Sequence, residues 1–154
     1  MIKCNIFCDV TFKKKKSLGA HTIGFAQCFT FKRRLFNFDG SGNPDPNLDT
    51  SLLTSLRSVC PDLSDSDTNL VELDPTSSAK FDNSFFRNLV NNSGLLQSDQ
   101  VLMRDNTTAS MVMTYSKYPY WFAKDFGASM VKMANLGVIT GQNGEIRKNC
   151  RVVN

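Results

Sequence analysis

The chain of 154 residues contains a single histidine, His21, in the segment Gly19-Ala20-His21-Thr22-Ile23-Gly24. Its imidazole is the one neutral nitrogen ligand that this chain can offer to a transition metal. Because no second histidine is present, any mechanism that needs two histidines from the same chain is excluded. Metal ligation is therefore the first chemistry to consider for this residue.

Four metal-binding side chains near the start of the sequence have a spacing close to that of a zinc finger. Cys4 and Cys8 are followed by His21 and then by Cys28. Thiolates and an imidazole suit tetrahedral zinc, and the four lysines at 13–16 could contact nucleic-acid phosphates. However, six residues separate the histidine from the last cysteine, whereas three to five are usual. Neighbouring glycines also weaken the helix that a finger needs. Zinc-dependent nucleic-acid binding therefore remains a minor alternative.

The positive charge of the chain lies in its first sixteen residues. Residues 1–16 contain five lysines and one aspartate, which account for the whole formal net charge of +4. The remaining residues are neutral overall, and the chain is 41% hydrophobic, which suits one ordinary domain with a modest core. We expect a basic leader over residues 1–16 and one domain over residues 17–154.

The sequence shows no membrane or export signal. No apolar run approaches the roughly 18–20 residues needed to span a bilayer. The first ten residues lack the continuous apolar region and the small-residue cleavage site of a signal peptide. We therefore expect no membrane partner, and no signal peptide is visible.

Apolar residues recur at helical spacing in three segments. These are residues 52–59 after the potential cap segment Asp49-Thr50-Ser51, residues 85–90 after Asp82 or Asn83, and residues 120–136 before Gly137. Internal repeats, heptads and long strand-like alternation are all missing from the sequence. The pattern predicts an all-α fold with little or no sheet.

Several ordered motifs resemble those of the plant secretory (class III) haem peroxidases. The segment around His21, followed by Cys28, is similar to the proximal-haem signature of that family. Six further motifs follow in the family's order and spacing: Asn43-Pro44-Asp45-Pro46, Val59-Cys60-Pro61, Leu73-Asp74-Pro75-Thr76, Phe81-Asp82-Asn83, Gly94–Gln100 and Gly144–Cys150. The resemblance covers Ser17 to Asn154, and it implies the proximal, C-terminal half of the mainly helical haem peroxidase fold, preceded by a nonhomologous leader.

The resemblance implies a haem site and an enzymatic activity. His21 would be the axial ligand to the iron of haem b. Asp99 would accept a hydrogen bond from the other ring nitrogen, which makes the ligand more basic. The family reaction is the oxidation of small phenolic donors by hydrogen peroxide, in peroxide catabolism and the response to oxidative stress.

The resemblance also implies a calcium site. Its ligands would be the side chains of Thr22, Asp74, Ser77 and Asp82, together with the backbone carbonyl of Lys80. Two carboxylates with hydroxyl and carbonyl oxygens suit a hard cation.

Further implied features concern secretion. Cys28 and Cys60 would form a disulfide that encloses 31 residues, worth about 3–4 kcal/mol on the chain-entropy model. Asn91 and Asn106 begin glycosylation sequons. The family is extracellular or vacuolar, and an oxidising compartment preserves such a disulfide. The family's partner for Cys150 lies in the other half of the enzyme, so its partner here is open.

The distal half of the family's fold is absent from this sequence, and with it the distal histidine and arginine. Loss of a general base typically lowers a rate by about 10²–10⁴, so we expect peroxide turnover barely above that of free haem. Family members are monomers, but a half-covered core is expected to leave apolar surface through which this chain associates. A haem-free structural or decoy fragment is the main alternative function.

Overall fold

The computed structural model describes residues 18–139, 141–149, 151, 152 and 154. The expected leader, with Cys4 and Cys8, and also Cys150 lie outside the described residues. The α-helices of the described part are α2 (Lys32–Phe36), α3 (Thr50–Val59), α4 (Ser84–Val90), α5 (Gln97–Gln100), α6 (Asn106–Lys117) and α7 (Pro119–Ala134). Short 3₁₀ helices join them: η1 (Leu18–Thr22), η2 (Cys28–Thr30), η3 (Phe38–Gly40), η4 (Ser64–Ser66), η5 (Val101–Met103) and η6 (Gly141–Asn143).

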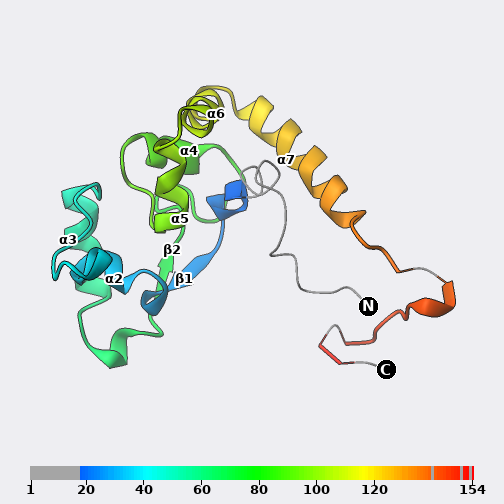
Figure 1. Cartoon of the computed structure of the whole chain (residues 1–154), viewed down its shortest axis with the longest axis horizontal. Coiled ribbons are helices and arrows are strands. Elements are labelled where there is room, and N and C mark those ends of the chain that lie inside the picture. Colours follow the sequence, from blue (N-terminus) through cyan, green and yellow to red (C-terminus); the bar gives the residue numbers. More distant parts are fainter. Residues whose placement is uncertain (1–17, 140, 150, 153) are drawn as a thin grey trace.

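Within the described residues, the only sheet has two strands, β1 (Phe25–Gln27) and β2 (Leu70–Glu72). They pair antiparallel, with Phe25 opposite Glu72. The mainly helical fold with little sheet is therefore confirmed. In Figure 1, α2 and α3 lie at one end, α4, α5 and α6 in the middle, and α7 at the other end.

The three helices predicted from the sequence are present. Asp49 caps α3 by accepting a hydrogen bond from the Leu52 amide at 2.9 Å. At the start of α4, Asp82 rather than Asn83 accepts from the Ser84 amide, at 2.7 Å. The long C-terminal prediction corresponds to α7.

The sequence analysis did not predict α6, because its apolar pattern is weak. Its buried positions are Thr108, Val112 and Tyr115, which have helical spacing, but the first of them is polar. The Thr108 hydroxyl donates to the Leu102 carbonyl at 2.5 Å, so this polar group is satisfied inside the core. Asp105 caps the helix by accepting from the Thr108 amide at 3.1 Å.

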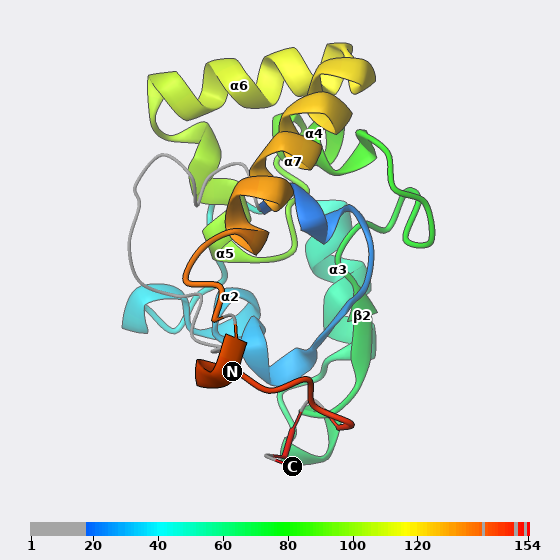
Figure 2. The same cartoon turned by 90° about the vertical axis from the view of Figure 1, so that its right-hand side faces the viewer.

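Two separate clusters of buried side chains form the interior. The aliphatic core consists of Cys28, Phe31, Leu35, Leu48, Leu56, Cys60 and Leu95. The aromatic core consists of Phe85, Phe86, Leu89, Leu102, Val112, Tyr115 and Phe122. Figure 2 shows α6 and α7 together at one end, above the elements that surround the aliphatic core.

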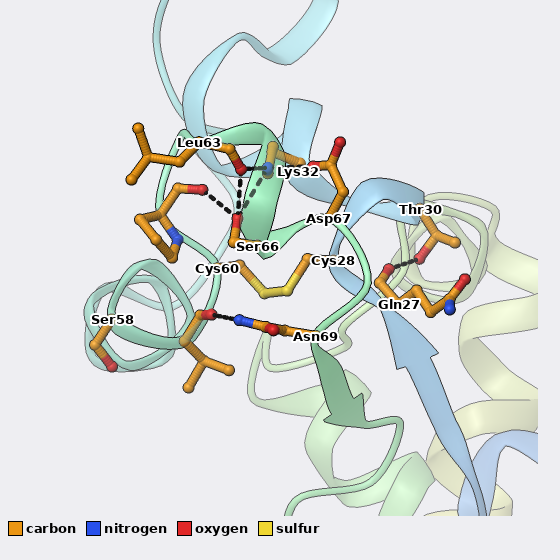
Figure 3. The surroundings of a disulfide bond; sticks show 12 residues. Gln27, Cys28, Thr30, Lys32, Ser58, Cys60, Leu63, Ser66, Asp67 and Asn69 are labelled. Carbon is orange, nitrogen blue, oxygen red and sulfur yellow. Dashed lines mark hydrogen bonds and ion pairs between the residues drawn. A yellow bond between two sulfur atoms is a disulfide. The ribbon is translucent and has the colours of Figure 1, made fainter.

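A disulfide joins Cys28 to Cys60 inside the aliphatic core, where both residues are fully buried. It ties the end of β1 to the end of α3 (Figure 3). Asn69 supports the same junction by donating from Nδ2 to the Val59 carbonyl at 2.8 Å. The chain between residues 28 and 60 is thereby closed into a covalent loop.

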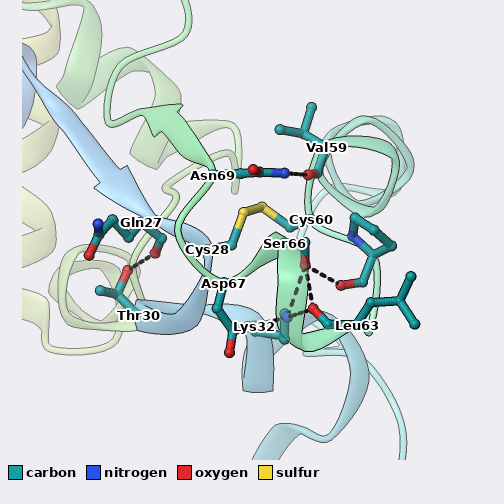
Figure 4. Close-up of polar contacts among 11 residues, drawn as sticks. Gln27, Cys28, Thr30, Lys32, Val59, Cys60, Leu63, Ser66, Asp67 and Asn69 are labelled. Atoms are coloured by element: carbon teal, nitrogen blue, oxygen red, sulfur yellow. Dashed lines mark hydrogen bonds and ion pairs between the residues drawn. A yellow bond between two sulfur atoms is a disulfide. The ribbon is translucent and has the colours of Figure 1, made fainter.

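Lys32 binds the loop that follows Cys60 in the chain, through contacts with residues 63–67 (Figure 4). Its Nζ donates to the Leu63 carbonyl at 2.7 Å and to the Ser66 hydroxyl oxygen at 3.0 Å, and it forms an ion pair with Asp67. The lysine side chain is 15% exposed. Three partners for one ammonium hold the loop against α2.

Among the described residues, the first half of α7 packs on the rest of the protein and the second half is largely exposed. Phe122 is 2% exposed and Phe126 packs against the aromatic core, but Met130 is 37% exposed and Val131 63% exposed. The apolar side chains predicted at helical spacing in this segment are therefore buried near the beginning of the helix and exposed near its end. The open end agrees with the expected exposed apolar surface. None of the helices in the described ranges is both long and apolar enough to cross a membrane.

Candidate functional site

His21 and Asp99 form a close pair. The Nδ1 atom of His21 lies 3.0 Å from each carboxylate oxygen of Asp99. The carboxylate is fully buried, whereas the histidine side chain is 29% exposed. Because Nδ1 donates its proton to the buried carboxylate, Nε2 is the ring nitrogen left with a lone pair for a ligand.

The surroundings of His21 make its ring more basic. The hydrogen bond to Asp99 raises the pKa of His21, partial burial opposes this rise, and the charge of Asp99 adds to it. A hydrogen-bonded carboxylate also fixes the orientation of an imidazole. Ser98 donates its hydroxyl to Asp99 at 3.3 Å, which holds the carboxylate in turn.

The local fold brings the two residues together although 78 positions separate them. His21 lies on η1, and Asp99 lies on the one-turn helix α5. Gly19 lets η1 approach the aromatic core, because a Cβ at this position would lie 2.5 Å from Cε2 of Phe122. The ring of Phe85 meets the edge of His21, with ring centroids 6.3 Å apart.

Oxygen atoms of the expected calcium ligands gather beside this pair. The Thr22 hydroxyl donates to the Asp82 carbonyl at 2.9 Å and lies 3.5 Å from the Lys80 carbonyl. The Ser77 hydroxyl donates to Asp82 at 3.0 Å and lies 3.4 Å from Asp74. The structure thus brings groups from residues 74–82 close to one another and to Thr22, more than fifty residues earlier.

The small sheet brings the segment before β1, which contains Thr22, towards Asp74. Beyond the pairing of Phe25 with Glu72, the Leu73 amide donates to the Gly24 carbonyl at 3.0 Å. Extension of this antiparallel register brings residue 22 next to residues 74 and 75. Gly24 has φ = +102°, a value that residues with a side chain rarely adopt.

The chemistry of this oxygen cluster fits a hard cation. Thr22 and Asp74 are fully buried, and no described lysine or arginine forms an ion pair with Asp74 or Asp82. Buried carboxylates usually have a cationic partner. Burial favours the protonated form of Asp82, but hydrogen bonds from Ser84 and Ser77 and the charge of Arg87 give a net lowering of its pKa.

With only two carboxylates, this cluster differs from a site built of acidic or sulfur ligands. The described ranges contain no group of three or more histidine, cysteine, aspartate or glutamate side chains that could hold a metal. Hydroxyl and carbonyl oxygens would have to complete the coordination, as calcium allows.

One supporting residue was missed by the sequence analysis. Asn88 on α4 donates from Nδ2 to Oδ1 of Asp74 at 2.8 Å. The side-chain oxygen Oδ1 of Asn88 accepts a hydrogen bond from the Thr76 hydroxyl at 2.9 Å. It therefore orients the buried carboxylate. No spacing rule connects an asparagine on a helix to an aspartate fourteen residues earlier, so the tertiary structure alone identifies it.

The zinc-finger alternative is not favoured by the structure. Cys28 is already bonded to Cys60, and Nδ1 of His21 is bonded to Asp99. A thiol in a disulfide cannot bind zinc as a thiolate. Of the two described members of the proposed set, Cys28 is thus unavailable to zinc, whereas Nε2 of His21 stays open to a ligand.

The two sequon asparagines lie on the surface. Asn91 follows the last residue of α4, and Asn106 is the first residue of α6. Both side chains are exposed. Among the described residues, no hydrogen bond connects either asparagine to His21 or Asp99.

Comparison with known proteins gives one consistent family. A family model described as peroxidase matches residues 18–118. Peroxidase 10 of Arabidopsis thaliana is 59% identical over 134 residues, which are 86% of this chain and 38% of that protein. Peroxidase N of Armoracia rusticana is 46% identical over 140 residues, 88% of this chain and 42% of that protein. The lignin-forming anionic peroxidase of Nicotiana tabacum is 44% identical over 138 residues, 88% of this chain and 43% of that protein. The chain spans about two fifths of the length of these relatives.

Proposed function

Because this chain belongs to the peroxidase family, we propose that it binds haem b through His21. The reaction proposed for it is the hydrogen-peroxide-dependent oxidation of small phenolic donors. The observation that carries the proposal is the hydrogen bond from Nδ1 of His21 to the fully buried Asp99. This bond leaves Nε2 as the free ligand atom on a partly exposed ring.

Each residue of the pair has a separate task in this proposal. His21 binds the iron, and Asp99 retains the Nδ1 proton and increases the electron density that the imidazole donates. When bound, haem supplies a redox-active iron that exchanges electrons with peroxide and with donors. The burial of Asp99 strengthens its interaction with the ring because water does not compete for the carboxylate.

Calcium is proposed as the second cofactor, bound by Thr22, Asp74, Ser77, Asp82 and the Lys80 carbonyl. Thr22 is the neighbour of His21 in the chain, so a cation bound there would fix η1 as well as the start of α4. Support comes from the fully buried Asp74, which has no ion-pair partner among the described lysines and arginines, and from the short distances between these oxygens.

We expect slow turnover from this chain alone. His21 is its only histidine, and iron ligation commits that imidazole. No second imidazole can act as a base toward peroxide, and positioned proton transfer is typically worth about 10²–10⁴ in rate. Peroxide turnover by the chain as given is therefore expected to lie close to that of free haem.

The test is a haem titration in the presence of calcium, followed by the Soret absorption band. We expect saturable binding with a histidine-ligated spectrum, loss of that spectrum in His21→Ala, and a shifted spectrum with weaker binding in Asp99→Asn. Ser98→Ala serves as a matched control, because it removes only the outer hydrogen bond at 3.3 Å. Equal uptake by the wild type and His21→Ala would contradict the proposal and favour the haem-free fragment.

We further propose an extracellular or vacuolar location and a division into residues 1–16 and 17–154. Members of this plant family are secreted, the Cys28–Cys60 disulfide is stable only in an oxidising compartment, and the exposed Asn91 and Asn106 are open to glycosylation. The family match beginning at residue 18 supports the boundary. Mass spectrometry of the protein from its source tests both statements, through its first residue and its glycans.

A further inference from the structure

Tyr115 differs from the other two tyrosines of the chain. It is 6% exposed, whereas Tyr118 and Tyr120 are 56% and 72% exposed. Its phenolic oxygen donates a hydrogen bond to Oδ2 of Asp125 at 2.6 Å, which links α6 to α7. A buried tyrosine normally finds some acceptor, but this acceptor is a carboxylate that can take up a proton.

A series of aromatic rings in contact connects Tyr115 to His21. The ring centroids are 5.2 Å apart between Tyr115 and Phe86, 5.1 Å between Phe86 and Phe85, and 6.3 Å between Phe85 and His21. Electron tunnelling weakens exponentially with distance, so a packed route without gaps favours it. Phenylalanine side chains are too difficult to oxidise to become radicals themselves. The electron would therefore tunnel through them.

The environment of Tyr115 determines how it could be oxidised. Burial and the hydrogen bond to Asp125 raise the pKa of the Tyr115 phenol, so it is neutral at physiological pH. A phenol that loses an electron becomes a very strong acid and must release its proton. Asp125 already accepts that hydrogen bond and is itself half-buried, so the proton needs to move only along an existing contact.

We propose that Tyr115 is a one-electron redox site that exchanges electrons with the haem held by His21. Tyr115 would give up one electron to a one-electron oxidant, which haem held by His21 would supply, while the phenolic O–H bond breaks and the proton passes to Oδ2 of Asp125. The product is a neutral tyrosyl radical beside a protonated carboxyl group. A phenolic donor in solution then returns one electron, Asp125 returns the proton, and the oxidised donor releases its own proton to water.

The natural oxidant of Tyr115 would be haem, so that part of the proposal rests on the proposed function. The oxidation of Tyr115 itself can be tested without haem. The probe is a photochemically generated one-electron oxidant, flash-oxidised ruthenium tris-bipyridine, acting on the full chain. The background variant carries Tyr118→Phe, Tyr120→Phe and Trp121→Phe, which removes the exposed oxidisable rings. Electron paramagnetic resonance of freeze-quenched samples then identifies the radical.

In this background we expect a tyrosyl radical that disappears on addition of Tyr115→Phe. Asp125→Asn keeps a hydrogen-bond acceptor but removes the proton acceptor, so it should slow radical formation about 100-fold, the scale of positioned proton transfer. It should also abolish the deuterium-oxide isotope effect. A merely structural hydrogen bond would leave the rate and isotope effect unchanged in Asp125→Asn, and that result, or a background variant without a tyrosyl radical, overturns the proposal.

A second measurement separates this site from the haem proposal. In haem-loaded protein treated with peroxide, the same radical should appear in the background variant and be absent from Tyr115→Phe. If haem fails to bind, the photochemical experiment still decides whether Tyr115 is a redox site. If haem binds and no Tyr115 radical forms with peroxide, the link to His21 is wrong even though the proposed haem function stands.

Discussion

The aliphatic core and the aromatic core are built by different means. The aliphatic core contains a buried disulfide and lies beside the buried ion pair of Arg34 and Asp45, whose Nε and Oδ2 atoms are 2.8 Å apart. The aromatic core has neither, and consists of rings in mutual contact, such as Phe86 with Phe122 at 4.8 Å. The first is held by a disulfide and an ion pair, whereas the second combines ring packing with the hydrogen bonds of Thr108 and Tyr115.

The difference matters because the candidate site draws on both regions. His21 touches the aromatic core through Phe85, whereas Thr22 is positioned by the strand that leads to the disulfide. Disturbing one region should therefore affect the two candidate cofactors unequally. The predictions below separate these contributions.

The largest expected loss of stability comes from removing one buried ring from the aromatic core. Phe122 is 2% exposed and lies against Phe81, Phe86 and Tyr115. Phe122→Ala is expected to lower the free energy of unfolding by about 4 kcal/mol, because it removes a buried ring and leaves a cavity. Urea denaturation measures this, with Tyr120→Ala on the exposed face of α7 as the control. Equal losses in the two variants would contradict the role given to the aromatic core.

Removal of the disulfide is expected to cause the next largest loss of stability. Replacement of Cys28 and Cys60 together by serine should cost about 3.5 kcal/mol, mainly by freeing the unfolded chain. The change should weaken calcium binding more than it weakens the His21–Asp99 contact, since β1 leads directly to Thr22. Calorimetric titration with calcium and haem compares the two. Mild reduction of the wild type should give the same loss, and an unchanged stability would refute this assignment.

The ion pair beside the aliphatic core should give a somewhat smaller and pH-dependent loss. Asp45→Asn breaks the bond to Arg34, and loss of one partner of a buried pair is expected to cost about 3 kcal/mol near neutral pH. Burial opposes ionisation of Asp45, but hydrogen bonds from Arg34 and Asn47 and the charge of Arg34 give a net lowering of its pKa from 3.8.

The sign of the pH effect follows from that lowered pKa. The stabilisation by Asp45 is fully present above the ordinary pKa of 3.8 and is lost as the pH falls through the lower value of the folded state. The stability difference between the wild type and Asp45→Asn should therefore be constant near neutral pH and shrink below about pH 3.8. Urea unfolding at several pH values would measure it, and a difference that grows in acid would show the reasoning to be wrong.

The smallest predicted effect is at the helix cap of α6. Asp105→Ala should cost about 1 kcal/mol, because the Thr108 amide loses its acceptor. Asp105→Asn preserves an oxygen at the same place and should cost less. Thermal melting of the two variants checks this. A larger loss in the asparagine variant would point to the charge of Asp105 rather than to its cap.

Local signals explain which elements could be predicted. Asp49 before the leucines of α3 is a chemical signal within one helical turn, so it is readable in the sequence. The helix α6 was missed because a threonine occupies one of its buried positions, and its hydroxyl finds the carbonyls of Leu102 and Asp105 as acceptors in the folded protein.

The types of the candidate ligands and their order along the chain can be read from the residues themselves. One histidine, a set of oxygen-bearing residues and the family's motifs follow from residue identity alone. Only the tertiary structure decided that Asp99 is fully buried against Nδ1 of His21, that Asn88 orients Asp74, and that Tyr115 donates to Asp125. The reason is physical: these contacts join side chains on different elements, and their distances and burial depend on how the helices pack.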